Sequence, residues 1–533
     1  MTSIILESVE IFLSSPTNVL LVLMALLMLA AFWSIRLPAD FPPGPRGWPF
    51  VGSMFDLATD PIGALTNFSR QYGDIFSIKI GGQRAVVLND IKSVLEALVK
   101  KQNEYAGRPW FFSVDLMTEG GEDIAFANLS PKWKALRKIA HQSIRNYASG
   151  HKLEKLVSEE AFTRLKKAIC EKKGEPFQPQ PLLMLMVSNV VAAMCFGQSY
   201  ELDDPEFQAI LKFIKDINDA FRYGLLADFV PIFRYVPTKG LRDVKKGTDA
   251  WLTLIQSKID EHKKTFRDDE PNDLVDYILT SQQEAMEAGE EEADSLTDVN
   301  VRQTVSDIFG GNDNLLLNLY IEIYPEKMTT LFYRKSIIYE LLNWCVAYLV
   351  CYPDVQAKVQ REIDDVIGQD RMPMLSDKGK LPYCDAVIHE VMRIRTVAPV
   401  AIHAALQDTS VGGYKIPKGT SIWLNLWSLH MDERQWKEPE EFRPERFLDE
   451  DGKALPKPES FLPFSAGRRV CVGEILAKNE MFLIFTSLYQ NYTFSSVPGK
   501  EKPSLKPTFE GLIARCPEYE VVAKYRGTDE SEE

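Results

Sequence analysis

The chain has 533 residues, of which 45% are hydrophobic and 26% are charged, a composition typical of globular proteins with a large core. Its 61 basic and 75 acidic residues give a formal net charge of -14, which argues against a generally cationic nucleic-acid-binding protein. The seven cysteines are odd in number and include no Cys-x-x-Cys pair, so neither a disulfide scaffold nor a zinc site is expected. This cysteine usage fits a body that folds in the reducing cytosol.

An apolar segment near the N-terminus predicts a membrane anchor. No charged residue occurs from Ile11 to Ile35, and Val19–Trp33 is unbroken apolar sequence, long enough with its flanks to cross a bilayer as one helix. A cleaved signal peptide is the alternative, but it needs a basic region before the apolar run, where this chain carries only acidic charges. The first basic residue, Arg36, follows the run, so the body should face the cytosol, with the endoplasmic reticulum as the expected membrane.

Composition divides the chain into an anchor, a spacer, one large body and a tail. Residues 1–36 form the anchor, and residues 37–53 form a spacer whose prolines fix the backbone dihedral φ and remove hydrogen-bond donors. No Gly/Ser-rich or Pro-rich linker divides the chain after residue 60, so residues 54–526 are predicted to be a single catalytic domain. Residues 527–533 are an acidic tail.

The periodicity of the body predicts a mainly α fold with minor β structure. Residues 75–90 alternate β-branched and polar residues around a Gly-Gly pair, which predicts a β-hairpin. Later segments place apolar residues three and four apart with charges on the opposite face, as amphipathic helices do; examples are 152–172, 250–264 and 355–367.

The most specific motif lies in the C-terminal part of the body. Phe464–Gly473 reads FSAGRRVCVG, which matches F-x-x-G-x-R-x-C-x-G at every fixed position and leads into an apolar-periodic helix. A cysteine just before a helix start is exposed to backbone N–H groups and to the positive end of the helix dipole. The pattern therefore predicts that Cys471 forms a thiolate and binds a metal.

From the proline spacer to about residue 526, the chain resembles the cytochrome P450 family of haem-thiolate monooxygenases. The resemblance implies a cytochrome P450 fold preceded by a single N-terminal transmembrane helix, with haem b (iron protoporphyrin IX) as cofactor and Cys471 as the axial iron ligand. Thiolate ligation favours O–O cleavage, which is the chemical reason for a cysteine at this position. Glu390 and Arg393 match the family's ExxR motif, and with Arg446 they should form a buried charge network beneath the haem.

The resemblance also implies which residues hold the two haem propionates. Trp133 and Arg137 match the family's WxxxR motif, whose spacing places both side chains on one helix face. Arg108, His403 and Arg469 are the remaining expected partners. Lys134 and Lys138 lie on the other face of the same predicted helix, where they form either a docking patch for an acidic electron donor or an ordinary solvated surface.

Stretches such as LRDVKKG and YKIPKGTSIWLNLWSLHMD look most like animal microsomal members, in the steroid 17-alpha-hydroxylase/17,20-lyase and aryl-hydrocarbon hydroxylase branches. This likeness implies insertion of one oxygen atom from O2 into a lipophilic substrate, either steroid-like or polycyclic aromatic. Electrons should come from NADPH through NADPH–cytochrome P450 reductase, with cytochrome b5 as a further candidate donor. No nucleic-acid partner is expected. Residues 109–127 and 205–240 are the variable loops expected to set substrate identity.

The family pattern breaks in the predicted central helix. That helix normally carries A/G-G-x-D/E-T, whose acid and alcohol deliver protons, and here Asp313 fits the acid whereas Asn314 replaces the threonine. Residues 315–336 then have no family counterpart, and the pattern resumes at Glu340. The extra segment is either a genuine looped insertion or a translated intron or gene-model error.

Three functions follow from these observations. The first is NADPH-dependent monooxygenation, with Asp313 as the provisional catalytic acid. The second is an oxygen-independent haem-thiolate isomerase or dehydratase, because members without the relay threonine catalyse such reactions. The third is an inactive variant that binds haem or ligand without forming product, because the central helix is interrupted.

Overall fold

The computed structural model describes residues 15–34, 38, 40–148, 151–201, 204–208, 226–229, 231–266, 271, 273–288, 296–310, 337–510 and 512–527. Asp313, Asn314 and the extra segment 315–336 lie outside the described residues, as do the first 14 residues of the anchor and the acidic tail beyond residue 527.

Helices make up most of the described chain, as the sequence predicts. Their bounds are α2 Pro16–Ser34, α3 Met54–Leu57, α4 Pro61–Tyr72, α5 Ile91–Leu95, α6 Phe112–Met117, α7 Pro131–Ala148, α8 His151–Glu154, α9 Phe162–Cys170, α10 Gln180–Phe196, α12 Leu226–Phe229, α13 Lys239–Thr265, α14 Leu274–Ala288, α15 Asp298–Gly310, α16 Ile337–Cys351, α17 Pro353–Val366, α18 Pro382–Ile394, α19 Leu426–His430 and α20 Glu474–Asn491. A π-helical stretch, Lys155–Ala161, joins α8 to α9, so the predicted 152–172 helix is three consecutive helical pieces.

The strands form one four-stranded sheet and three two-stranded ribbons. Their bounds are β1 Ile75–Ile80, β2 Gln83–Leu88, β3 Val400–Ala404, β4 Thr409–Val411, β5 Tyr414–Ile416, β6 Ser421–Asn425, β7 Tyr492–Ser496, β8 Thr508–Glu510, β9 Ile513–Arg515 and β10 Val521–Tyr525. The four-stranded sheet has the order β1-β2-β6-β3, in which β2 and β6 are parallel and the other pairs are antiparallel. The predicted hairpin is confirmed as β1–β2, and its turn contains Gly81 at φ 57°.

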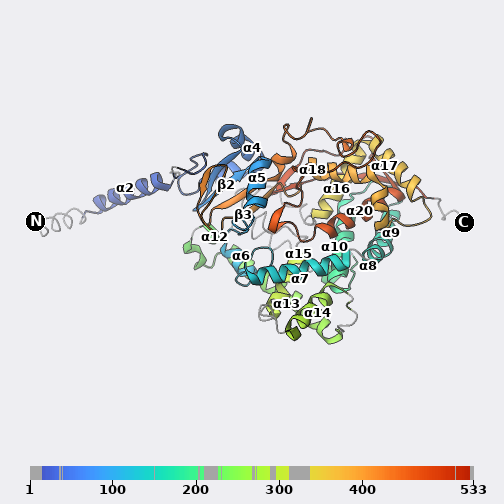
Figure 1. The fold of residues 1–533 in the computed structure, drawn as a ribbon, viewed down its shortest axis with the longest axis horizontal. Coiled ribbons are helices and arrows are strands. Elements are labelled where there is room, and N and C mark those ends of the chain that lie inside the picture. Colours follow the sequence, from blue (N-terminus) through green and yellow to red (C-terminus); the bar gives the residue numbers. More distant parts are fainter. Residues whose placement is uncertain are drawn as a thin grey trace, which may run out of the picture.

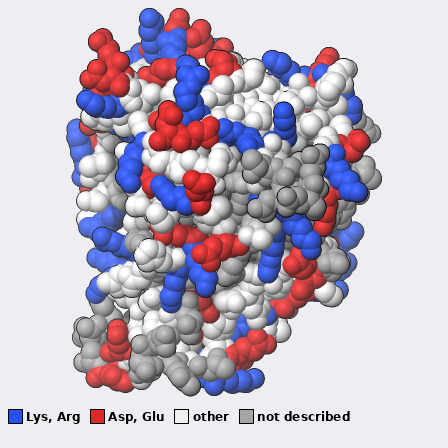
Figure 2. Space-filling view, turned by 90° about the vertical axis from the view of Figure 1, so that its right-hand side faces the viewer, with Lys and Arg blue, Asp and Glu red and all other residues white. Residues whose placement is uncertain are grey.

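The largest core cluster is built around α16 and α20. In α16, 13 of the 15 residues are buried, and in α20 every residue of Met481–Gln490 is buried. The sheet covers one end of the body, and α13 and α14 lie on a separate flank below α7 (Figure 1). On the face that Figure 2 shows, Lys and Arg side chains are interspersed with Asp and Glu, so the described residues form no single-sign surface there.

Helix α2 projects from the sheet end of the body (Figure 1). Its large apolar side chains are about half exposed or more, namely Leu20, Leu21, Leu23, Met24, Leu26, Met28 and Leu29. The sequence predicts a transmembrane helix in this region, whereas no helix within the described residues reaches the length and hydropathy of a membrane span.

A buried ionic contact joins α13 to α14. Nε2 of His262, near the end of α13, lies 2.6 Å from Oδ2 of Asp273, and Oδ1 of Asp273 accepts a hydrogen bond from the Asp276 N–H at 3.0 Å. Burial lowers the pKa of His262, but the hydrogen bond and charge of Asp273 outweigh burial and raise the pKa above its usual value. The pair therefore stabilises the junction of the two helices most strongly when His262 is protonated.

Replacing His262 with glutamine is expected to lower the free energy of unfolding by about 1–3 kcal/mol at pH 6, the usual worth of a charged hydrogen bond. Because the folded pKa is raised, this contribution is complete below the ordinary histidine pKa and is lost as pH rises through the folded value. Urea unfolding at pH 6 and pH 9 would measure the difference, with the exposed His141→Gln as the control. An equal effect of His262→Gln at both pH values would contradict the prediction.

Candidate active site

The segment Phe464–Gly473, which we call the thiolate loop, contains a short 3-10 turn, Gly467–Arg469, and leads into α20. Gly467 has φ 70°, and a Cβ atom there would collide with the Leu98 carbonyl oxygen, so the sequence needs glycine at this point. The N–H of Cys471 donates to the Phe464 carbonyl at 3.0 Å, which closes the loop and places Cys471 three residues before α20. The predicted position of the cysteine, just before a helix start, is confirmed.

The Cys471 thiol faces a cavity of about 390 Å³ inside the body. Burial raises the pKa of Cys471, and a hydrogen bond from the Gly473 N–H lowers it without overcoming burial. In the protein alone, burial therefore outweighs the backbone hydrogen bond that favours the thiolate. The sulfur is exposed to the cavity, where a cation such as a metal ion would stabilise the thiolate.

Two guanidinium groups, those of Arg108 and Arg469, line the same cavity. Arg108 Nε donates to the Ala125 carbonyl at 2.9 Å, and Arg469 Nε donates to the Ala106 carbonyl at 2.8 Å. These acceptors are neutral, and among the described residues neither arginine forms a salt bridge within 4 Å. Within the described residues, the Asp123 carboxylate acts on both arginines but forms no salt bridge with either of them.

The pKa values of the two arginines are lowered by their surroundings. Burial lowers the pKa of Arg469 to about 8, with further contributions from the nearby charges of Arg108 and Arg137. Burial likewise lowers the pKa of Arg108 to about 10, although the carboxylate of Asp123 acts in the opposite direction. Such a cluster fits a dianionic ligand, and the two propionates of a haem have the required charge.

His403, on β3, also lines the cavity and is buried. Its Nδ1 lies 3.0 Å from the Tyr105 carbonyl, to which only an Nδ1–H can donate. Burial, followed by the charges of Arg108 and Arg469, lowers the pKa of His403 well below its usual value. His403 is therefore neutral in this environment, and a nearby anion would favour its protonation.

Trp133 and Arg137, on α7, are not among the residues that line this cavity. Trp133 Nε1 donates to the Ile124 carbonyl at 2.9 Å, and Arg137 donates to the Val470 carbonyl beside Cys471. Arg469 Cζ lies 4.2 Å from the centre of the Trp133 ring, a cation–π contact. Among the five expected propionate partners, Arg108, His403 and Arg469 meet at the cavity, while Trp133 and Arg137 brace its wall.

Apolar side chains from several elements form most of the remaining cavity wall, including Phe111, Phe126, Ile308, Ile338, Leu341 and Val397. Two of the contributing elements are α15, which ends at Gly310, and α16, which begins at Ile337. Described residues on both sides of residues 311–336 therefore line the cavity. A wall of this kind suits a lipophilic ligand.

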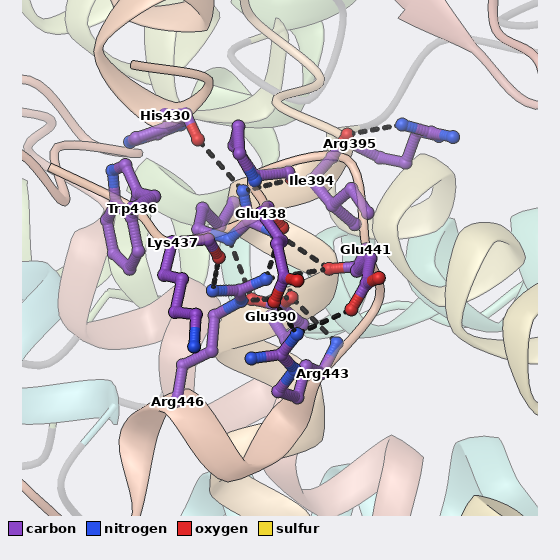
Figure 3. Close-up of polar contacts among 12 residues, drawn as sticks. Glu390, Ile394, Arg395, His430, Trp436, Lys437, Glu438, Glu441, Arg443 and Arg446 are labelled. Atoms are coloured by element: carbon purple, nitrogen blue, oxygen red, sulfur yellow. Dashed lines mark hydrogen bonds and ion pairs between the residues drawn. The ribbon is translucent and has the colours of Figure 1, made fainter. Parts of the chain in front are cut away.

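The predicted charge network is confirmed in the structure (Figure 3). Arg393 donates to both Glu390 oxygens, at 2.7 and 2.8 Å, and Arg446 Nε donates to Glu390 at 3.0 Å. Arg393 and Glu390 are fully buried, and Arg393 also donates to the main-chain carbonyls of His430 and Pro439. The network thus ties α18 to the segment that precedes the thiolate loop.

Sequence reasoning missed two carboxylates next to the site. Asp307 lines the cavity, and Asp123 is buried beside the arginine cluster. Burial raises the pKa of both groups, and their mutual repulsion adds to the rise in Asp307. A signal for Asp307 was available, because it lies on the predicted central helix about two turns before Asp313.

Comparison with known proteins agrees with this geometry. The family model "Cytochrome P450" matches residues 42–314 and 341–522 and leaves residues 315–340 unmatched. A steroid 17-alpha-hydroxylase/17,20 lyase of Gallus gallus is 38% identical over 492 residues, which are 90% of this chain and 91% of that protein. Cytochrome P450 1A5 of Gallus gallus is 33% identical over 501 residues, 91% of this chain and 90% of that protein.

A solved structure of a zebra fish cytochrome P450 with progesterone superposes with a TM-score of 0.74. It is 36% identical in sequence, and the match covers 87% of this chain and 99% of that one. The family uses haem and electrons derived from NADPH. With its thiolate loop, buried charge network and cavity in the same body, the chain belongs to the cytochrome P450 monooxygenase family.

Proposed function

We propose that this protein inserts one atom of O2 into a steroid-like substrate, with electrons supplied from NADPH through a reductase. The observation that carries the proposal is the cavity, which combines the Cys471 thiol, the guanidinium groups of Arg108 and Arg469, and apolar walls. The relatives named steroid 17-alpha-hydroxylase/17,20 lyase and the related structure with progesterone support a steroid-like molecule. A polycyclic aromatic is the alternative substrate class, favoured by the likeness to cytochrome P450 1A5.

In this proposal Cys471 would bind the haem iron, and Arg108, His403 and Arg469 would hold the haem propionates. Trp133 and Arg137 contribute indirectly by fixing the backbone and the Arg469 guanidinium. The haem, when bound, supplies an iron at which O2 is activated, and thiolate ligation favours O–O cleavage. The apolar wall excludes water and orients the substrate.

Proton delivery is assigned to Asp313 by its place in the family motif, although this residue lies outside the described part of the chain. With Asn314 in place of the relay threonine, the carboxyl lacks its hydroxyl partner. The expected consequence is partial uncoupling, in which some of the electrons reduce O2 to species that are released without forming product.

The electron donor is proposed to dock on the outer face of α7. Lys134, Lys138, His141 and Arg145 are exposed along this face at spacings of three and four residues. Arg137, which precedes Lys138 on α7, contacts the carbonyl of Val470 next to Cys471. A donor with an acidic surface, such as the reductase or cytochrome b5, would therefore lie close to the thiolate loop.

Charge reversal of Lys134 and Lys138 to glutamate is expected to lower the second-order rate of reductase-driven reduction by about tenfold at low salt, because steering charges act mainly on association. Turnover driven by peroxide, which needs no donor, should stay unchanged. The charge-matched control reverses Lys167 and Lys172, which are exposed on and just after α9. Stopped-flow reduction would decide, and equal slowing by both double variants would contradict α7 docking.

The cellular placement is proposed to be the endoplasmic reticulum membrane, with a single N-terminal pass and the catalytic body in the cytosol. The exposed apolar side chains of α2 and the lack of charge from Ile11 to Ile35 support this placement. A lipophilic substrate would partition into the same membrane. Carbonate extraction of microsomes tests the anchor, because a peripheral protein is released by this treatment.

The activity itself is tested by incubating the haem-loaded full chain with reductase, NADPH, progesterone and ¹⁸O2. The proposal predicts a product heavier by one ¹⁸O atom and dependent on both NADPH and reductase. Conversion of peroxides without reductase or O2 would instead favour the isomerase or dehydratase alternative. Haem binding without any product from steroids or polycyclic aromatics would favour the inactive variant.

A further inference from the structure

One face of α15 holds a loop against the cavity. Asn300, Gln303 and Asp307 are spaced three and four residues apart, so their side chains lie on the same side of the helix. All three bind the segment Met117–Ala127, which we call the covering segment, and we call these three residues the α15 clasp. The clasp therefore fixes one side of the loop that follows α6.

The three clasp residues bind the covering segment at three different places. Gln303 Nε2 donates to the Met117 carbonyl at 3.2 Å, and Asn300 Nδ2 donates to the Glu122 carbonyl at 3.0 Å. Asp307 Oδ2 accepts two backbone N–H groups, from Ile124 at 2.7 Å and from Ala125 at 3.1 Å. Asp307 is the member of the clasp that lines the cavity.

The carbonyls of the same backbone bind Trp133 and the two arginines, Arg108 and Arg469, that are proposed to hold the haem propionates. The Ile124 carbonyl accepts from Trp133 Nε1 at 2.9 Å, and the Ala125 carbonyl accepts from Arg108 Nε at 2.9 Å. Two residues later, the Ala127 carbonyl accepts from Arg469. Residues 124 and 125 therefore bind Asp307 through their N–H groups, and they bind Trp133 and Arg108 through their carbonyl groups.

We propose that Asp307 is a positioning residue for haem, because it fixes the backbone whose carbonyls orient Arg108, Arg469 and Trp133. This inference rests on the proposed role of those residues toward the haem propionates. Without the Asp307 oxygen, the two N–H groups lose their acceptor and the covering segment is free to shift, and the guanidinium groups then shift with it. The haem would be held less tightly, although none of the proposed propionate partners has changed.

The geometry also says which property of Asp307 matters. Both N–H groups donate to the same oxygen, so an asparagine whose amide oxygen occupies that place can accept both. Burial and the neighbouring Asp123 raise the pKa of Asp307 well above its usual value, so a full negative charge is not needed for this role. Asp307→Asn should therefore preserve the function, and Asp307→Ala should lose it.

The test measures haem loss from the haem-loaded full chain to excess apomyoglobin. Asp307→Ala is expected to release haem about tenfold faster than the wild type, the change that corresponds to one typical hydrogen bond, and Asp307→Asn within about twofold of it. Ser306→Ala is the matched control, because Ser306 is adjacent on α15 but accepts from Trp251 rather than from the covering segment. Equal rates for Asp307→Ala and the wild type, or equal rates for the alanine and asparagine variants, would overturn the proposal.

Hydrogen exchange of the Ile124 and Ala125 amides provides a readout that does not need haem. Exchange at both amides should rise in Asp307→Ala and stay low in Asp307→Asn and Ser306→Ala. Unchanged exchange in the alanine variant would show that Asp307 does not hold the Ile124 and Ala125 amides in place. If the wild type bound no haem, the proposed function would fail, and the exchange data would still decide whether Asp307 holds the covering segment.

Discussion

Replacing Cys471 with alanine is expected to abolish the red-shifted Soret band of the reduced, carbon-monoxide-bound protein and to reduce monooxygenase turnover to background. Cys471 is the cysteine that lines the described cavity, and its hydrogen bond to Phe464 fixes the loop that presents it. The buried thiols of Cys195, Cys345, Cys384 and Cys516 lie away from this wall, so they cannot take over ligation. Absorption spectra of reduced protein with and without carbon monoxide would measure the loss.

The matched control for this prediction is Cys170→Ser. Cys170 lies at the end of α9, is exposed, and contacts the hydroxyl of Tyr492 at 3.7 Å. This variant should keep the shifted band at wild-type intensity. A red-shifted band that survives in Cys471→Ala would show that another group binds the iron.

Replacing Glu390 with alanine should lower the free energy of unfolding by about 3–5 kcal/mol, the typical cost of removing one partner from a buried ion pair. The reason is that Arg393, which is fully buried, and Arg446, which is almost fully buried, would both keep their charge without the carboxylate between them. Remaining hydrogen bonds to the main-chain carbonyls of His430 and Pro439 do not neutralise Arg393. Urea unfolding of the haem-loaded protein would measure the change, and the yield of haem-loaded protein should fall with it.

Arg443→Ala is the matched control, because Arg443 lies in the same region but pairs through its side chain with the exposed carboxylates of Glu438 and Glu441 (Figure 3). Exposed ion pairs contribute little to stability, so this variant should unfold nearly as the wild type does. If Glu390→Ala were no more destabilised than Arg443→Ala, the buried network would not hold α18 in place as we describe.

The features that the sequence predicts correctly depend on local patterns. The β1–β2 hairpin follows from alternation around Gly81, and the Cys471 loop follows from ten residues with five fixed types. The network of Glu390, Arg393 and Arg446 is predictable because the resemblance carried all three residues in order. In each case the residues that matter are identified by their neighbours in the chain.

The features that the sequence does not predict depend on contacts between distant segments. Trp133 and Arg137 have the expected spacing, but that spacing does not reveal that they donate to the carbonyls of Ile124 and Val470. Asp307 and the covering segment are about 180 residues apart, and nothing in either stretch reveals that they meet. The raised pKa of Cys471 likewise comes from burial, which a helix-start motif does not report.

The extra segment shows a further limit of sequence reasoning. Its position is evident from the motif, and the family model breaks at residues 314 and 341 on either side of it. The structure adds that α15 and α16, which flank the break, both contribute to the cavity wall.

The central claim is that this 533-residue chain, with Asn314 and the extra segment in place, holds haem through Cys471. The most direct measurement is the reduced carbon-monoxide difference spectrum of the full chain, with circular dichroism on the same sample to show that it is folded. We predict the red-shifted Soret band of thiolate ligation. A folded chain whose Soret band is absent or unshifted would contradict the claim.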